Sequence, residues 1–205
     1  MKESITIFWF RRDLRLHDNR GLYEALNTAH PVLPLFIYDT DILDKLEDKE
    51  DRRVSFIYKH LLEIKTNLES FGSGMLVKKG KPVEVFGELL SGLNIVRVYT
   101  NRDYEPYAQK RDKEVEKLLN DSGIDLLTFK DQVIFEKDEV LKDDGNPYTV
   151  FTPYMKKWKN VLNNLSIQQF PSEDNFEGFL RSSPLPFPSL QELGFEINDT
   201  HFPEK

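Results

Sequence analysis

Two dense clusters of charged and aromatic residues are the part of this 205-residue chain that could recognise a ligand. The first, FWFRRDLRLHDN at residues 8–19, places three arginines, two aspartates and a histidine within nine consecutive positions. The second, NRDYEPYAQKRD at residues 101–112, combines the carboxylates of Asp103 and Glu105 with two tyrosines. Carboxylates accept hydrogen bonds from ring amides or hydroxyls, and tyrosines offer flat apolar faces. These residue types fit a planar heteroaromatic ligand.

The same charges also have a purely structural interpretation. Arg11, Arg12 and Arg15 would pair with Asp103 and Glu105 at a crowded loop junction. Structural ion-pair networks hold charges together just as a binding site does, so residue types alone do not separate the two interpretations. Both of them require the two clusters to lie side by side.

Several common chemistries lack their motifs in this sequence. The absence of cysteine excludes disulfides, thiolate metal sites and a cysteine nucleophile. The four histidines have no metal-ligand spacing, and neither a glycine-rich phosphate loop, a G-x-S-x-G elbow nor an H-E-x-x-H pair occurs. We therefore predict no catalytic residue and no metal site here, and no NAD or ATP held by the usual glycine-rich turn.

The length of 205 residues suits one domain of generous size, or one domain with an irregular extension. The net charge of −7 should repel a phosphate backbone, so any contact with nucleic acid needs a local patch or protein outside this sequence. The first residues lack the apolar core of a signal peptide, and no run approaches the roughly 18 apolar residues of a membrane span. We expect a cytoplasmic protein with no membrane partner.

Alternating apolar segments predict the elements that position the two clusters. Strand-like runs cover residues 5–10, 32–38, 75–78, 95–100 and 125–129, with helical patterns between them. This alternation predicts an α/β fold, a doubly wound (Rossmann-like) five-stranded parallel sheet in the order 3-2-1-4-5. Because strands 1 and 4 are then neighbours, the clusters that follow them border one crevice at the carboxyl edge of the sheet.

Beyond Phe129 the periodicity fades, which predicts a core over residues 1–130 and an irregular C-terminal extension with the start of an interdomain linker over 131–205. Within the extension, Phe151, Tyr154 and Trp158 share a helical face if a helix begins near Pro153. These aromatic residues would either form a docking surface for another domain or seal this domain's own core.

Three segments together resemble one known family. In their order and spacing, FWFRRDLRLHDN, YTNRDYEPYAQKRDKEV and GNPYTVFTPYMKKW are similar to the N-terminal α/β domain of the DNA photolyase and cryptochrome family. The resemblance covers residues 5–158, with a weaker echo in LGF at 193–195 and HFP at 201–203. It implies an intact light-driven, FAD-dependent deoxyribodipyrimidine photo-lyase that repairs pyrimidine dimers in DNA.

The resemblance also implies a division of labour in the intact protein. FAD and the lesion pocket belong to a C-terminal helical domain that is absent from this sequence, and this segment alone is expected to be inactive. Damaged DNA would be bound only through the intact protein. The present domain would dock against the helical domain and hold an antenna chromophore, and its candidate contacts are Phe36, Asp39, Arg53, Asp103 and Glu105.

The resemblance assigns the remaining charges and the antenna as follows. Arg11, Arg12, Asp13 and Arg15 would organise the loop and the domain interface. Folate-using relatives tend to carry an Asn-Glu pair where this sequence has Tyr107 and Ala108, which favours a flavin or deazaflavin, or no antenna, over folate. A cryptochrome-type blue-light signalling domain and a small nucleotide-binding α/β module are the alternative functions.

Overall fold

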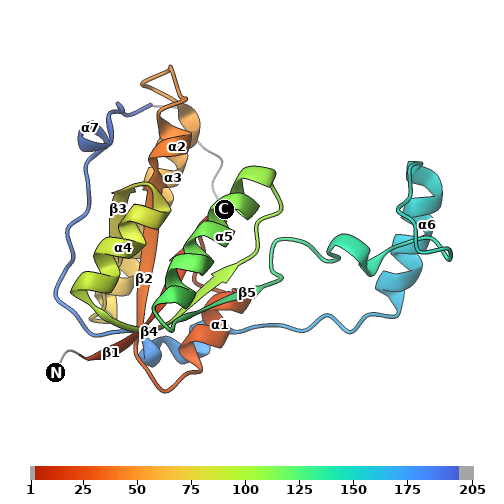
Figure 1. The fold of residues 1–205 in the computed structure, drawn as a ribbon, viewed down its shortest axis with the longest axis horizontal. Coiled ribbons are helices and arrows are strands. Elements are labelled where there is room, and N and C mark those ends of the chain that lie inside the picture. Colours follow the sequence, from red (N-terminus) through yellow and green to blue (C-terminus); the bar gives the residue numbers. More distant parts are fainter. Residues whose placement is uncertain (1–2, 199–205) are drawn as a thin grey trace.

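A five-stranded parallel sheet in the order β3-β2-β1-β4-β5 forms the centre of the protein (Figure 1). The computed structural model describes residues 3–198. The strands are β1 (Ser4–Phe10), β2 (Val32–Asp39), β3 (Leu76–Gly80), β4 (Asn94–Asn101) and β5 (Asp125–Phe129). Every strand pair is parallel. The predicted fold class and strand order are confirmed.

The nearly unbroken apolar runs of β1 and β2 are buried on both faces, as strands in the middle of a doubly wound sheet must be. Alternate side chains enter two separate cores. Phe8 and Phe36 belong to the core beneath α1 (Arg20–Leu26) and α3 (Arg52–Ser70). Trp9 and Ile37 belong to the core beneath α4 (Pro82–Gly92) and α5 (Pro106–Asp121).

Local signals in the sequence explain where the helices begin. The side chain of Asn19 caps α1 by accepting a hydrogen bond from the Leu22 N–H at 3.2 Å. Asp51 caps α3 in the same way. Pro82 and Pro106 occupy the first positions of α4 and α5, where the missing proline N–H has no helical partner to lose.

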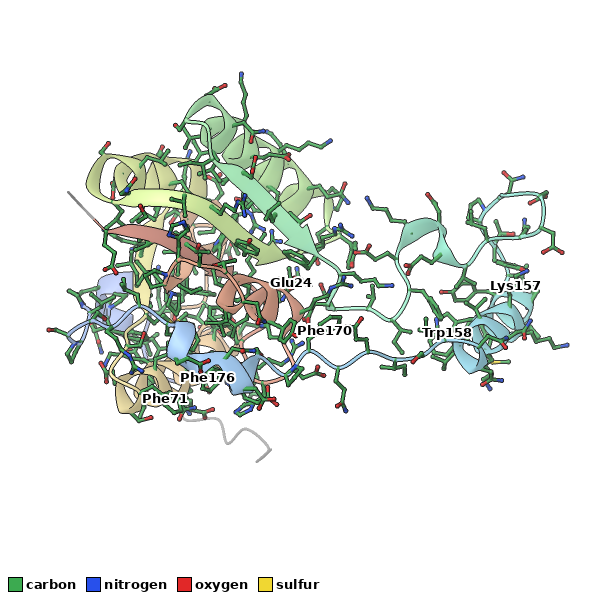
Figure 2. All side chains as sticks on the ribbon, turned by 90° about the horizontal axis from the view of Figure 1, so that it is seen from below. Glu24, Phe71, Lys157, Trp158, Phe170 and Phe176 are labelled. Carbon is green, nitrogen blue, oxygen red and sulfur yellow. The ribbon has the colours of Figure 1, made fainter. Side chains whose placement is uncertain are left out.

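The chain beyond β5 forms an arm and then returns to the sheet. The arm, residues 132–169, contains η1 (Lys137–Glu139) and α6 (Phe151–Asn163) and projects away from the body of the domain (Figures 1 and 2). Helix α6 begins at Phe151, two residues before the predicted start, because proline is tolerated in the first turn of a helix.

The returning chain packs along the edge of β2 and against the core beneath α1 and α3. After η2 (Ser172–Gly178), Phe179 is 2% exposed and the Leu180 N–H donates to the Val32 carbonyl at 2.8 Å. Leu193 of α7 (Leu190–Leu193) and Phe195 join the core below α3. Residues 179–195 thus complete a core that the first 130 residues begin. The sequence echo at 201–203 lies outside the described residues, and no helix within 3–198 is long and apolar enough to cross a membrane.

Candidate functional site

A cavity of about 630 Å³ opens at the carboxyl ends of β1 and β2, between the starts of α3 and α5. This is the edge where doubly wound sheets bind ligands. Aromatic and aliphatic side chains supply most of its wall, among them Trp9, Phe10, Phe36, Ile37, Leu43, Val54, Phe56 and Ile57. The wall is therefore largely apolar, as expected for a site that holds a flat organic ring.

All five residues that the resemblance proposed as antenna contacts line this cavity. Phe36 and Asp39 come from the end of β2, Arg53 from the start of α3, and Asp103 and Glu105 from the loop between β4 and α5. The structure thus brings the predicted set together in one place. Their binding of a chromophore stays a prediction.

The polar end of the cavity is built around Asp39, which is 6% exposed. Its Oδ1 accepts the Asp41 N–H at 3.0 Å, and its Oδ2 accepts the Tyr107 hydroxyl at 2.6 Å. Nη1 of Arg111 lies 4.0 Å from the same Oδ2. Burial, followed by the bond to Asp39 and its charge, raises the pKa of Tyr107 above its ordinary value, so the hydroxyl stays a donor at neutral pH.

Sequence reasoning missed Arg111 as a member of this site. Arg111 lies one helical turn beyond Tyr107 on α5, and residues four apart share a face of a helix. Its guanidinium lies 5.0 Å from the ring centroid of Trp9, and that of Arg11 lies 5.1 Å away. Two cations therefore flank the indole, which is 1% exposed. The i, i+4 spacing between Tyr107 and Arg111 could have indicated that both side chains face the cavity.

The ion-pair interpretation holds for the rim of the cavity. Arg12 Nε lies 3.2 Å from Asp103, and its Nη2 lies 2.7 Å from Glu105. The side chains of Arg12 and Glu105 are 54% and 61% exposed. Glu105 is thus a solvated member of an ion pair in this structure, so its carboxylate is a weaker ligand contact than that of the buried Asp39.

The other two arginines of the first cluster do not pair with Asp103 or Glu105, which corrects that part of the interpretation. Arg11 bonds Asp112 of α5 at 2.5 Å and also donates to the Asn101 carbonyl. Arg15 donates to Asp131, just beyond β5, at 2.8 Å. The strand order explains the change, because the loop after β1 reaches the ends of both β4 and β5.

A buried amide and carboxylate junction organises the loop that follows β1. Asn101 at the end of β4 donates to Asp13 at 2.6 Å and to the Asn19 side chain at 2.8 Å. Its own Oδ1 accepts the Gly21 N–H at 2.9 Å. A Cβ on Gly21 would lie 2.6 Å from that oxygen, so this position requires glycine. Sequence reasoning did not identify Asn101 as a residue that organises this loop, although its position at the end of β4 could have indicated that role.

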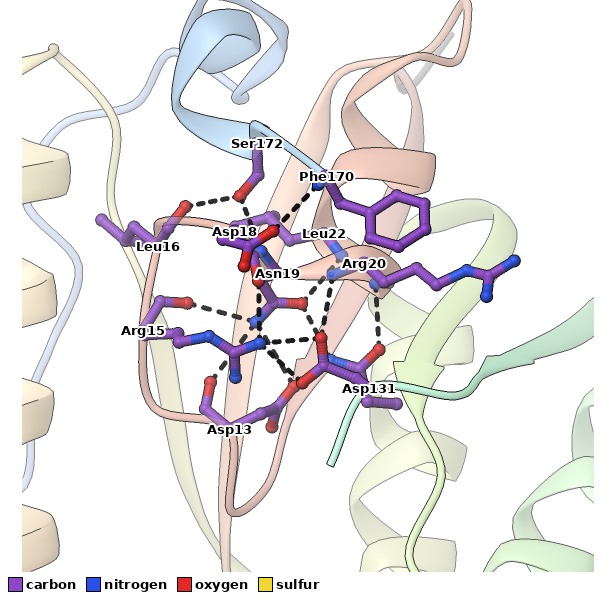
Figure 3. Close-up of polar contacts among 12 residues, drawn as sticks. Asp13, Arg15, Leu16, Asp18, Asn19, Arg20, Leu22, Asp131, Phe170 and Ser172 are labelled. Atoms are coloured by element: carbon purple, nitrogen blue, oxygen red, sulfur yellow. Dashed lines mark hydrogen bonds and ion pairs between the residues drawn. The ribbon is translucent and has the colours of Figure 1, made fainter. Parts of the chain in front are cut away.

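The same loop holds both ends of the arm (Figure 3). On the departing side, Asp131 accepts from Arg15 and from the Arg20 N–H at 3.1 Å. On the returning side, Asp18 accepts the Phe170 N–H at 2.9 Å. The residues 13–20 that make these bonds are called the clamp loop below.

Ser172 completes the attachment of the returning chain to the clamp loop (Figure 3). Its hydroxyl donates to the Leu16 carbonyl at 2.7 Å and accepts the Asn19 N–H at 3.2 Å. Ser172 and Asn19 are 0% exposed, and Leu16 is 3% exposed. The first sequence cluster therefore serves mainly to fasten the chain.

The aromatic face of α6 lies far from this attachment. Phe151 is 72% exposed and Tyr154 is 36% exposed, and α6 buries no residue. Trp158 packs edge-on against Phe135 of the arm itself, at 5.5 Å between ring centroids. Figure 2 shows Trp158 on the projecting arm, away from the body of the domain. These aromatic residues do not seal the core, which excludes one of the two interpretations of this segment.

Comparison with known proteins identifies the family. The family model for DNA photolyase matches residues 6–174, from β1 into η2. The chain belongs to the DNA photolyase family. The matched range contains the cavity edge, the clamp loop and the whole arm, so all three belong to the photolyase pattern.

Two curated relatives show how much of a photolyase this chain represents. A deoxyribodipyrimidine photo-lyase of Synechococcus sp. (strain ATCC 27144 / PCC 6301 / SAUG 1402/1) is 36% identical over 75% of this chain, a match that covers 31% of the relative. An uncharacterized 31.6 kDa protein of Synechococcus sp. (strain PCC 6716) is 33% identical over 96% of this chain and 68% of its own length. The chain thus matches about a third of that photo-lyase.

A solved photolyase structure shares the fold. The archaeal photolyase of Sulfolobus tokodaii, described with two FAD molecules that imply a novel light-harvesting cofactor, superimposes with a TM-score of 0.66. It is 29% identical, and the match covers 80% of this chain and 36% of that one. The present chain therefore corresponds to the N-terminal domain of a photolyase.

Proposed function

We propose that this domain binds an antenna chromophore of the flavin or deazaflavin type for a light-driven, FAD-dependent DNA photolyase. The observation that carries the proposal is the apolar, aromatic cavity with Asp39 buried at its polar end. Its volume of about 630 Å³ lies within the range of roughly 300–1,000 Å³ that is typical of organic ligand sites.

The residues present fit a ring with a polar edge. Asp39 accepts a ring N–H, and the Arg111 guanidinium near it donates to a ring carbonyl. Phe36 and the rings around it cover the flat faces, while Arg53 and the Asp103–Glu105 loop border the opening. When bound, the antenna supplies light absorption and passes its excitation energy to FAD. The two FAD molecules described for the Sulfolobus tokodaii photolyase support a flavin in this role.

DNA repair belongs to the intact protein in this proposal. The FAD-binding helical domain is the partner, and the exposed face of α6, with Phe151 and Tyr154, is the surface that docks on it. Damaged DNA is bound only through the intact protein, in line with the net charge of −7 on this chain. The segment alone, mixed with pyrimidine-dimer DNA under blue light, is expected to repair nothing.

Binding titrations test the antenna proposal. The purified chain is offered FMN, a 5-deazaflavin and folate separately, and fluorescence is followed to saturation. We expect both flavin-type rings to bind more tightly than folate. Tighter binding of folate, or no binding of any ring, contradicts the proposal.

Two substitutions locate the binding. Asp39→Asn should weaken FMN binding about tenfold, because a hydrogen bond to a charged group is worth about 1.5–3 kcal/mol. The matched control is Asp41→Asn. Asp41 lies two residues away, is 44% exposed and pairs with Lys81 instead of lining the cavity. If Asp39→Asn and Asp41→Asn bind FMN with equal affinity, the ring does not bind at Asp39.

A further inference from the structure

One hydrogen bond crosses the polar end of the cavity and limits what that end accepts. Tyr107 lies in the first turn of α5, the helix that follows β4, and Asp39 ends β2, so the 2.6 Å bond between them joins α5 to β2 across the end of β1. Both residues line the cavity. The Tyr107 hydroxyl therefore takes up one of the two acceptor positions of Oδ2 that face a bound ring.

Each oxygen of the Asp39 carboxylate already has one donor. Oδ1 holds the Asp41 N–H at the start of α2 (Thr40–Leu43), and Oδ2 holds the Tyr107 hydroxyl. A ring edge with two neighbouring N–H donors pairs with a carboxylate through both oxygens, as a guanidinium does. Such an edge would bring its second donor to Oδ2, which already has the Tyr107 hydroxyl at 2.6 Å and Nη1 of Arg111 at 4.0 Å, so the two donors would crowd the same oxygen.

An imide edge makes a smaller demand on Asp39. It presents one N–H between two carbonyl groups, so one lone pair of the carboxylate satisfies it. The nearby Nη1 of Arg111 is placed to donate to a flanking carbonyl. The other carbonyl group of the imide would lie near the negative charge of Oδ2. The Tyr107 hydroxyl bonded to Oδ2 reduces the repulsion between that oxygen and the carbonyl.

We propose that Tyr107 is a specificity-determining residue, which by occupying Oδ2 of Asp39 makes the cavity select imide rings over 2-amino-4-oxo rings. This inference rests on the proposed binding of an aromatic ring in the cavity. It extends that proposal by assigning the discrimination to one hydroxyl group.

Two pteridines that differ at one position test the inference. Lumazine carries the imide edge, whereas pterin carries an amino group at the same ring carbon and so presents two neighbouring donors. The affinity of each is measured by fluorescence titration of wild type and Tyr107→Phe. We expect wild type to prefer lumazine and the lumazine-to-pterin affinity ratio to fall about tenfold in Tyr107→Phe, the loss that one charge-assisted hydrogen bond predicts.

The ratio is the decisive quantity, because a general loosening of the cavity changes both affinities together. Tyr104→Phe is the matched control, since the Tyr104 hydroxyl also bonds a carboxylate, Glu136 at 2.5 Å, but Tyr104 does not line the cavity. Riboflavin and folic acid, the larger ligands with the same two edges, are measured in parallel.

The outcomes separate the two proposals. Binding of riboflavin with both affinity ratios unchanged in Tyr107→Phe overturns the role of Tyr107 and leaves the antenna proposal standing. An equal change in Tyr104→Phe overturns it as well. Binding of no ring to wild type refutes the antenna proposal and this inference together.

Discussion

Replacing Ser172 with alanine tests whether the clamp loop holds the returning chain. The Ser172 hydroxyl is the partner of two buried backbone groups, the Leu16 carbonyl at 2.7 Å and the Asn19 N–H at 3.2 Å. Neither Ser172 nor Asn19 is exposed, so water does not replace the lost bonds. An unsatisfied buried group costs about 1–3 kcal/mol, and partial relaxation reduces the sum for two groups to about 2–4 kcal/mol.

Urea unfolding followed by circular dichroism measures this loss. With a slope of about 2 kcal/mol per molar urea, the midpoint should fall by about 1–2 M. Ser182→Ala is the matched control, because the Ser182 Oγ is buried without a hydrogen-bond partner among residues 3–198. That variant should equal wild type or exceed it in stability. A Ser172→Ala midpoint within 0.25 M of wild type, about 0.5 kcal/mol at this slope, refutes the reasoning.

Three further predictions concern single side chains. Tyr38 is 3% exposed and its hydroxyl has no partner within the described chain, so Tyr38→Phe should raise the free energy of unfolding by about 1 kcal/mol. Burial raises the pKa of Tyr38, so folded wild type keeps a proton that the unfolded chain loses above pH 10. The free energy of unfolding of wild type should therefore fall above pH 10, by up to about 1.4 kcal/mol per pH unit. In urea unfolding at several pH values, Tyr38→Phe should show a smaller fall. An equal fall in wild type and variant would contradict the role of Tyr38. Asp51→Ala removes the cap of α3 and should cost about 1 kcal/mol at pH 7. The side-chain hydrogen bond from Arg53 lowers the pKa of Asp51, so the capping contribution is present above pH 4 and should fade as the pH falls to 2, where a persisting difference would contradict it. Phe151→Asp should change the free energy of unfolding by less than about 0.5 kcal/mol, because the ring is 72% exposed; a larger loss in thermal or urea unfolding would place the ring in the folded core.

The sheet was predictable because its strands carry strong local signals. Buried runs such as Ile5–Phe10 leave little choice of structure, and Pro106 and Gly123 mark the limits of α5 in the sequence itself. The strand order then followed from the general rules for right-handed parallel connections. The return of Phe179 to the edge of β2 carried no such signal, because a single aromatic residue in a proline-rich segment has no period to detect.

The candidate site was predictable in its location and less so in its pairings. Placing the clusters after β1 and β4 sufficed to bring Asp103 and Arg12 together. The partners of Arg11 and Arg15 depend on side-chain length and on the loop beyond β5, which residue types do not specify. The bond between Tyr107 and Asp39 spans 68 positions, so only the folded chain reveals it.

The first cluster joins the cavity to the arm. Arg11 flanks Trp9 at the cavity wall and bonds Asp112 of α5, while Arg12 pairs with Asp103 at the cavity rim. A few residues later, Arg15 and Asp18 hold the two ends of the arm. A loop with these tasks needs charged residues, because each bond reaches a different element across the edge of the sheet. Its charge density is thus explained by positioning, because the same loop contacts the cavity wall and anchors both ends of the arm.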